Sequence, residues 1–98
     1  LHEELRKLKN EYQMISDVRG RGLLQGFELQ DVDERTDRFV FGQALYEKML
    51  QMGLITELES RKNLENVVVV LHPALIASRA DVDRAVNIIR NSFNACLG

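Results

Sequence analysis

The segment that decides the fold of this chain is Ile15–Leu29, which reads ISDVRGRGLLQGFEL. Apolar and polar residues alternate up to the run RGRG at 19–22, and a second apolar run follows it. This pattern is typical of two strands joined by a glycine-rich bend, because glycine enters positive φ without a penalty from Cβ. We therefore predict a hairpin with strands over 14–19 and 23–29.

The segments on either side of this hairpin have the periodicity of amphipathic helices. Before it, apolar side chains recur at helical spacing while charged residues fill the opposite side. After it, the polar stretch 30–37, QDVDERTD, predicts a solvated loop, and a second helix follows that ends at Gly53. The apolar positions of the two helices are Leu1, Leu5, Leu8 and Tyr12, and Phe41, Leu45, Met49 and Met52.

Two further strands and a last helix complete the pattern. We predict a short strand over 54–58, a polar turn over 59–66 and a buried, valine-rich strand over 67–71. Ser78 followed by Asp81 indicates a helix start at which the serine side chain caps backbone N–H groups. The last helix carries an apolar stripe of Val82, Val86, Ile89, Phe93 and Leu97.

The predicted order of elements is α-β-β-α-β-β-α, within a single domain over residues 1–98. Helices that cover one face of a small, largely antiparallel sheet are the natural packing for this order, which places the chain in the α/β (α+β) class. A chain of this length lies near the lower limit of what a single hydrophobic core stabilises.

Composition excludes several classes of protein. The formal net charge of −2 argues against a nucleic-acid-binding protein, whose surface is usually basic. No apolar run approaches the roughly 20 residues that span a bilayer, and no signal-peptide pattern opens the chain. The single cysteine, Cys96, cannot form an internal disulfide, so a cytoplasmic location is expected. The chain begins at Leu1, inside a helical pattern, which indicates a fragment or a processed chain.

The spacing of the polar residues defines no catalytic or metal site. The two histidines, His2 and His72, lie far apart in the sequence, whereas a zinc site needs several His, Cys or acidic ligands at ordered spacing. Asp31, Asp33 and Asp37 resemble the start of a calcium loop, but the glycine and the glutamate that such a loop requires are missing. We therefore assign no catalytic, cofactor-binding or metal-binding residue in this chain.

The glycines Gly20, Gly22 and Gly26 do not form a dinucleotide-binding fingerprint. Their spacing is one residue too long, and a strand rather than a helix N-terminus is predicted after Gly22, so helix N–H groups are lacking for a phosphate. By pattern alone the chain is a small α/β module. A free-standing domain that binds a small ligand or a partner protein, without catalysis, is one interpretation of it.

A second interpretation comes from residues 17–28, DVRGRGLLQGFE. They resemble the segment D-V-R-G-x-G-L-x-x-G-x-E in the C-terminal small domain of the class III aminotransferases, which use pyridoxal 5'-phosphate (PLP). The resemblance continues in the same order along the chain. Residues 53–55 are similar to the family's next strand, 67–71 to its hydrophobic strand, 73–76 to its P-P-L-like turn, and 79–97 to its final helix.

The resemblance implies a fold like the small domain of fold type I PLP enzymes, and it implies an activity for a longer parent protein. That parent would transfer an amino group between an amine or amino acid and an oxo acid or aldehyde, with PLP as its cofactor. The Schiff-base lysine and the PLP-binding groups of this family belong to the large domain of the same polypeptide. The chain alone would therefore bind no PLP and be inactive. Racemases, aminomutases and decarboxylases share the architecture and stay open.

The sequence contexts of the lysines in this chain agree with a Schiff-base lysine that lies in the large domain. A Schiff-base lysine needs a desolvated setting that lowers its pKa. The four lysines instead lie in polar, helix-face or turn contexts, which predicts solvated surface positions for Lys7, Lys9, Lys48 and Lys62.

The resemblance also implies that the domain closes one side of the substrate site and supports a homodimer. It places Arg19, Gly20 and Gly22 at the face that meets the large domain, near the mouth of the active site, with the glycines as backbone requirements. The alternative for Arg19 is an exposed arginine at a strand end, since arginine is mostly exposed. Many members carry an arginine that grips a substrate carboxylate where this chain has Val70, so we assign that role to no residue.

Overall fold

The structure is a computed structural model that describes residues 1–21, 24–32, 37–61, 66–72 and 76–97. Its helices and strands follow the predicted order, and the predicted α+β class is confirmed. The elements are α1 (His2–Glu11), β1 (Ile15–Arg21), β2 (Leu24–Leu29), α2 (Arg38–Gln51), β3 (Thr56–Arg61), β4 (Asn66–Leu71) and α3 (Arg79–Leu97).

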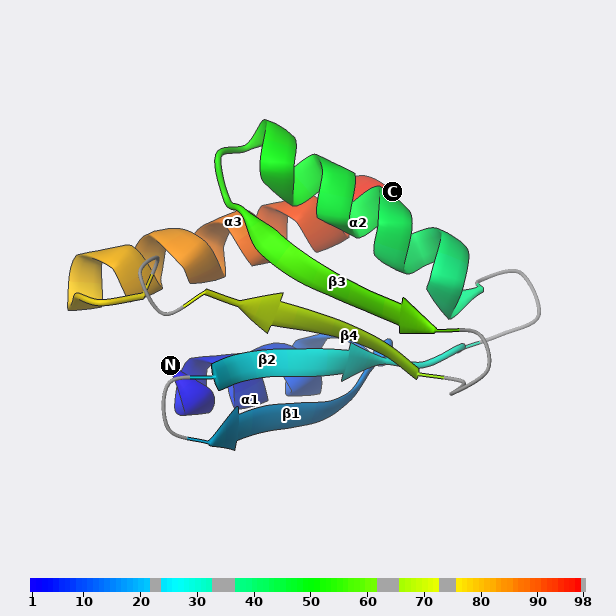
Figure 1. The fold of residues 1–98 in the computed structure, drawn as a ribbon, viewed down its shortest axis with the longest axis horizontal. Coiled ribbons are helices and arrows are strands. Elements are labelled where there is room, and N and C mark those ends of the chain that lie inside the picture. The colour runs from blue at the N-terminus through cyan, green and yellow to red at the C-terminus, as the bar shows by residue number, and fades with distance from the viewer. Residues whose placement is uncertain (22–23, 33–36, 62–65, 73–75, 98) are drawn as a thin grey trace.

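The strands form one antiparallel sheet in the order β1-β2-β4-β3. β1 and β2 are the predicted hairpin, and β4 lies between β2 and β3, so β1 and β3 are the two edge strands. Figure 1 shows α1 and α3 behind the sheet and α2 beside β3. Among the described residues, no helix is long and apolar enough to cross a membrane.

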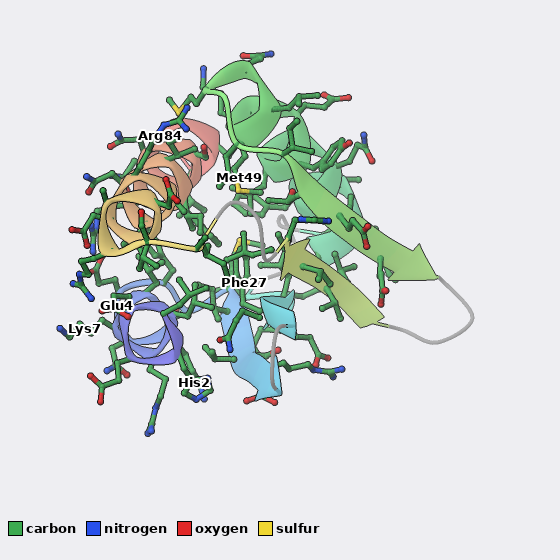
Figure 2. The ribbon with its side chains drawn as sticks, turned by 60° about the vertical axis from the view of Figure 1, so that its left-hand side comes forward. His2, Glu4, Lys7, Phe27, Met49 and Arg84 are labelled. Carbon is green, nitrogen blue, oxygen red and sulfur yellow. The ribbon has the colours of Figure 1, made fainter. Side chains whose placement is uncertain are left out.

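The core lies between the helices and one face of the sheet. Side chains of a strand alternate between the two faces, so Val67, Val69 and Leu71 of β4 are buried against the helices while Val68 and Val70 lie on the opposite face. Figure 2 shows Phe27 and Met49 in the interior. The other fully buried large side chains are Leu5, Leu8, Ile15, Leu29, Leu45, Ile89 and Phe93.

Phe93 of α3 lies at the centre of an aromatic cluster within this core. Its ring centroid is 4.6 Å from that of Tyr12, 5.6 Å from that of Phe41 and 5.9 Å from that of Phe27. These partners come from the end of α1, from α2 and from β2. One fully buried ring therefore joins all three helices to the sheet.

The predicted helix ends are confirmed where the structure describes them. Gly53 follows α2 with φ of 94°, the left-handed conformation that favours glycine at a helix C-terminus. At the start of α3, the backbone N–H of Asp81 donates to Ser78 Oγ at 3.1 Å. At the start of α2, the N–H of Phe39 donates to Asp37 Oδ1 at 2.7 Å, so the last residue of the predicted polar loop is a helix cap.

Several predicted boundaries were wrong. β1 continues beyond Arg19 through Gly20 to Arg21, so Gly20 belongs to a strand and not to the bend. Residues 22–23, on which the rest of the predicted bend falls, lie outside the described residues. Met52 and Leu97 were predicted on apolar helix faces but are 37% and 50% exposed. Met52 follows the last residue of α2 and Leu97 is the last residue of α3, so both lie at the margin of the core.

The third strand was also misplaced. It was predicted over 54–58 with a turn after it, whereas β3 spans Thr56–Arg61. Glu57 and Glu59 are exposed and Thr56 is buried, so the strand alternates although few of its residues are apolar. An edge strand that is solvated on one face needs little hydrophobic surface, and its pattern is therefore easily taken for a polar turn.

Candidate functional site

One face of the sheet is left uncovered by the helices of the described part of the chain, and we call it the open face. Two valines lie in its middle, and charged side chains lie around them. Its residues are Asp17 and Arg19 of β1, Gly26 and Glu28 of β2, Val68 and Val70 of β4, and Glu57 and Glu59 of β3. The candidate residue Arg19 thus lies on a face that another domain or molecule can reach.

Arg19 forms an ion pair with Glu28 on the open face. Its Nη2 donates to Glu28 Oε2 at 2.5 Å, and the side chains are 52% and 19% exposed. The register pairs Arg19 with Gly26 and Asp17 with Glu28, so the arginine and Glu28 are diagonal neighbours on two paired strands. Guanidinium carries five N–H donors in a planar fork, so one bond to Glu28 orients Arg19 and leaves donors for a further acceptor.

Arg19 also belongs to a row of residues that crosses the sheet. Gly26 of β2 is paired with Arg19 on one side and with Val70 of β4 on the other, and Glu57 of β3 follows Val70. Val70 is the position at which the resemblance described above implies a carboxylate-binding arginine in many members of the family. Arg19 is therefore two strands away from that position, on the same face, with a glycine between them.

The glycines of the hairpin have different roles. A Cβ at Gly26 would lie 2.4 Å from the backbone oxygen of Val69, so Gly26 allows the close approach of β2 and β4. A Cβ at Gly20 would meet only the flexible end of the Gln25 side chain, at 2.7 Å, and φ of Gly20 lies outside the left-handed region. Gly26 was not among the predicted site residues, and it is a stricter backbone requirement than Gly20. Gly22 lies outside the described residues.

Ionic contacts between α1 and α3 hold the helical layer together. Arg79 Nη1 donates to Glu4 Oε1 at 2.6 Å, and Arg90 donates through Nε and Nη2 to both oxygens of Glu11 at 3.0 Å. Arg79, and then the amino group of Leu1, lower the pKa of Glu4 to about 2. Arg90 lowers the pKa of Glu11 below its ordinary value.

We expect the free energy of unfolding to fall as the pH drops from about 4.5 to about 2. The pKa of Glu4 is about 2 in the folded chain against an ordinary 4.5. Because the folded value is the lower one, this carboxylate stabilises the fold above pH 4.5, and that contribution is lost as the pH falls through 2. Thermal unfolding should give Glu4→Gln a Tm a few degrees below wild type at neutral pH, and the gap should close in acid.

The exposed Glu3 on the same helix turn provides the matched control. Glu3→Gln should follow the wild-type pH profile, since no ion pair of Glu3 is found among the described side chains. A Glu4→Gln variant whose Tm has the same pH dependence as wild type would contradict the assignment of acid sensitivity to the contact with Arg79.

The described lysines are not placed to form a Schiff base with PLP. Lys7 and Lys9 are exposed on α1, and Figure 2 shows Lys7 pointing away from the molecule. Lys48 is partly buried on α2, and Lys62 lies outside the described residues. A Schiff-base lysine requires a desolvated pocket. Within the described part of the chain no step of PLP chemistry can therefore be assigned.

Of the histidines and aspartates considered in the sequence, those that the structure describes lie at the surface or at the start of a helix. His2 is exposed at the start of α1, and His72 is exposed after β4. Asp31 accepts the backbone N–H of Arg38 at 2.8 Å and lies 3.2 Å from its guanidinium, while Asp37 caps α2. Asp33 lies outside the described residues. No group of three or more His, Cys, Asp or Glu side chains that could hold a metal ion is found in the part of the chain that the structure describes.

Solved transaminase structures contain the same fold. A transaminase from the marine bacterium Virgibacillus is 24% identical with a TM-score of 0.81, and the match covers 99% of this chain and 23% of that one. The lysine aminotransferase from M. tuberculosis is 22% identical with a TM-score of 0.77, covering 97% of this chain and 19% of that one. The fold is therefore one that solved transaminases contain within about a fifth of their length.

Sequence comparison establishes the family. The family model described as "Aminotransferase class-III" matches residues 1–93. The taurine–pyruvate aminotransferase of Bilophila wadsworthia is 36% identical over 98 residues, which cover 95% of this chain and 21% of that protein. An (R)-1-hydroxy-2-aminoethylphosphonate ammonia-lyase of Vibrio splendidus is 34% identical over 94 residues, which cover 95% of this chain and 19% of that protein. The chain belongs to the class III aminotransferase family, and it spans about a fifth of the length of these relatives.

Proposed function

We propose that these residues are the C-terminal small domain of a PLP-dependent class III aminotransferase. The parent protein would transfer an amino group between an amine or amino acid and an oxo acid or aldehyde. The family match over residues 1–93 supports the family, and the taurine–pyruvate aminotransferase supports the reaction type. PLP serves in such enzymes as an electron sink, and the protein supplies binding and orientation.

The observation that carries the proposal is the oriented arginine on the open face. Arg19 is half-exposed, and Glu28 holds it on the face that the helices leave bare. A domain that closes one side of a substrate site needs an uncovered face that excludes water when it contacts the rest of the enzyme. Such a face also needs hydrogen-bond donors that are already in position, such as a guanidinium group. We propose that the part of this face on β1 and β2, around Arg19, contacts the large domain of the same polypeptide and that the parent is a cytoplasmic homodimer.

The Schiff-base lysine would belong to the large domain, so the isolated chain should be inactive. The whole parent with an amine and an oxo acid should yield the amino acid derived from that oxo acid. An ammonia-lyase such as the Vibrio splendidus relative is named for a reaction that releases ammonia. Ammonia release from the parent without an oxo acid would overturn transamination while leaving the domain assignment in place.

We expect Arg19→Ala in the full-length parent to lower kcat/KM by about tenfold or more, since charged hydrogen bonds at a substrate site are strong. The Tm should change little, because an exposed ion pair contributes little to stability. Steady-state kinetics and thermal unfolding separate the two effects. Arg6→Ala, on the exposed side of α1, is the matched control and should leave both unchanged. An unchanged kcat/KM for Arg19→Ala would rule out the role of Arg19.

A further inference from the structure

β3 has a free backbone edge. It is the outermost strand of the sheet and pairs only with β4 in the described part of the chain. Figure 1 shows β3 at the margin of the sheet next to α2. In an antiparallel strand, alternate residues direct their N–H and C=O groups away from the partner, so an edge strand presents a row of donors and acceptors.

A hollow of about 490 Å³ accompanies this edge. Gln43 and Tyr46 of α2 line one side, and residues 56–59 of β3 line the other. Thr56 is 4% exposed, and its Oγ1 has no hydrogen-bond partner among the described residues. Buried hydroxyl groups are normally hydrogen-bonded, so an unpaired one beside a hollow indicates a place for a further donor or acceptor.

The charge along the edge selects the kind of partner. Glu57 and Glu59 are both exposed on the open face, and no ion pair of either is found among the described side chains. A second copy of β3 paired in antiparallel fashion would bring these glutamates against each other, which is unfavourable. A strand with cationic side chains at alternate positions would instead pair each glutamate with an opposite charge.

We propose that an extended peptide segment with lysine or arginine at alternate positions adds to β3 as a further strand. Its backbone would bond to the free edge, as in other cases of strand addition to a sheet. Its cationic side chains would face Glu57 and Glu59, and its other side chains would enter the hollow between β3 and α2. This binding surface lies at the opposite edge of the sheet from Arg19, so it is independent of the proposed catalytic role.

The test uses the 98-residue chain and a synthetic peptide of four Lys-Val repeats. Addition of the peptide should shift the NMR signals of the backbone amides of Glu57, Leu58 and Glu59. Hydrogen exchange of the amides in β3 should become slower. The doubly substituted Glu57→Lys, Glu59→Lys variant should bind this peptide about tenfold more weakly or worse, and a Glu-Val peptide more tightly than wild type does. Both substitutions are on exposed side chains, so the fold should tolerate them.

Asp17→Lys provides the matched control, because Asp17 is an exposed acid on the open face at the other edge strand. It should change the affinity less than about twofold. Equal weakening by Asp17→Lys would indicate attraction by the whole acidic face and would overturn the proposal. Peptide-induced amide shifts confined to residues outside β3 would also overturn the proposal. So would sedimentation that reveals a dimer abolished by the β3 substitutions, because the partner would then be another copy of this chain.

Discussion

Phe93→Ala is expected to lower the free energy of unfolding by about 3–5 kcal/mol, the usual cost of removing a buried phenylalanine ring. Phe93 is fully buried and contacts the rings of Tyr12, Phe27 and Phe41. These residues belong to elements far apart in the sequence, so the cavity would open where the helices and the sheet meet. Domains of this size are stable by only about 5–15 kcal/mol, so the variant should be near the limit of folding.

Urea unfolding followed by circular dichroism would measure this loss. Leu97→Ala is the matched control, since Leu97 lies one turn further along α3 and is 50% exposed. It should cost less than about 1 kcal/mol. If Phe93→Ala and Leu97→Ala had the same midpoint in urea, the aromatic cluster would not be the centre of the core.

The order and type of the elements could be predicted from the sequence because each carries its own periodicity. α3 shows this best, since Val82, Val86, Ile89 and Phe93 repeat at helical spacing and all face the core. The hairpin was likewise recognisable from alternation on both sides of its glycines. Local patterns of this kind depend only on residues close together in the sequence.

β3 was misplaced because its stabilising partners are distant. Its pattern TELESR contains one large apolar residue, Leu58, and its strand character comes from pairing with β4. The position of β4 between β2 and β3 is equally a product of long-range pairing. No periodicity within 56–61 specifies that neighbour, so the strand order could not be predicted.

The candidate site was predicted in part. Arg19 was selected from its motif, but its partner Glu28 was not, although both lie in the quoted segment. Once the register of the hairpin is fixed by the pair Arg19 and Gly26, the diagonal contact with Glu28 follows from strand geometry. The missing information was the register, which depends on the exact turn between β1 and β2.

Gly26→Ala is expected to lower the free energy of unfolding by about 3 kcal/mol, at the upper end of the cost of overpacking. The new Cβ would lie 2.4 Å from the backbone oxygen of Val69, and backbone in the middle of a sheet cannot move aside as a side chain can. Relief of the contact requires β2 and β4 to separate. Because Arg19 is paired with Gly26, the same shift should also displace the arginine from Glu28.

Gly20→Ala in the same hairpin is the matched control. It should raise the free energy of unfolding or leave it unchanged. Its Cβ would meet only the end of the Gln25 side chain, which can turn away, and the backbone of Gly20 is not left-handed. Replacing glycine by alanine at such a position restricts the unfolded chain and stabilises by about 0.4–1 kcal/mol. Unfolding in urea compares the two variants directly. Equal stability of Gly26→Ala and Gly20→Ala would mean that the sheet accommodates a side chain between β2 and β4, and that the glycine does not set their spacing.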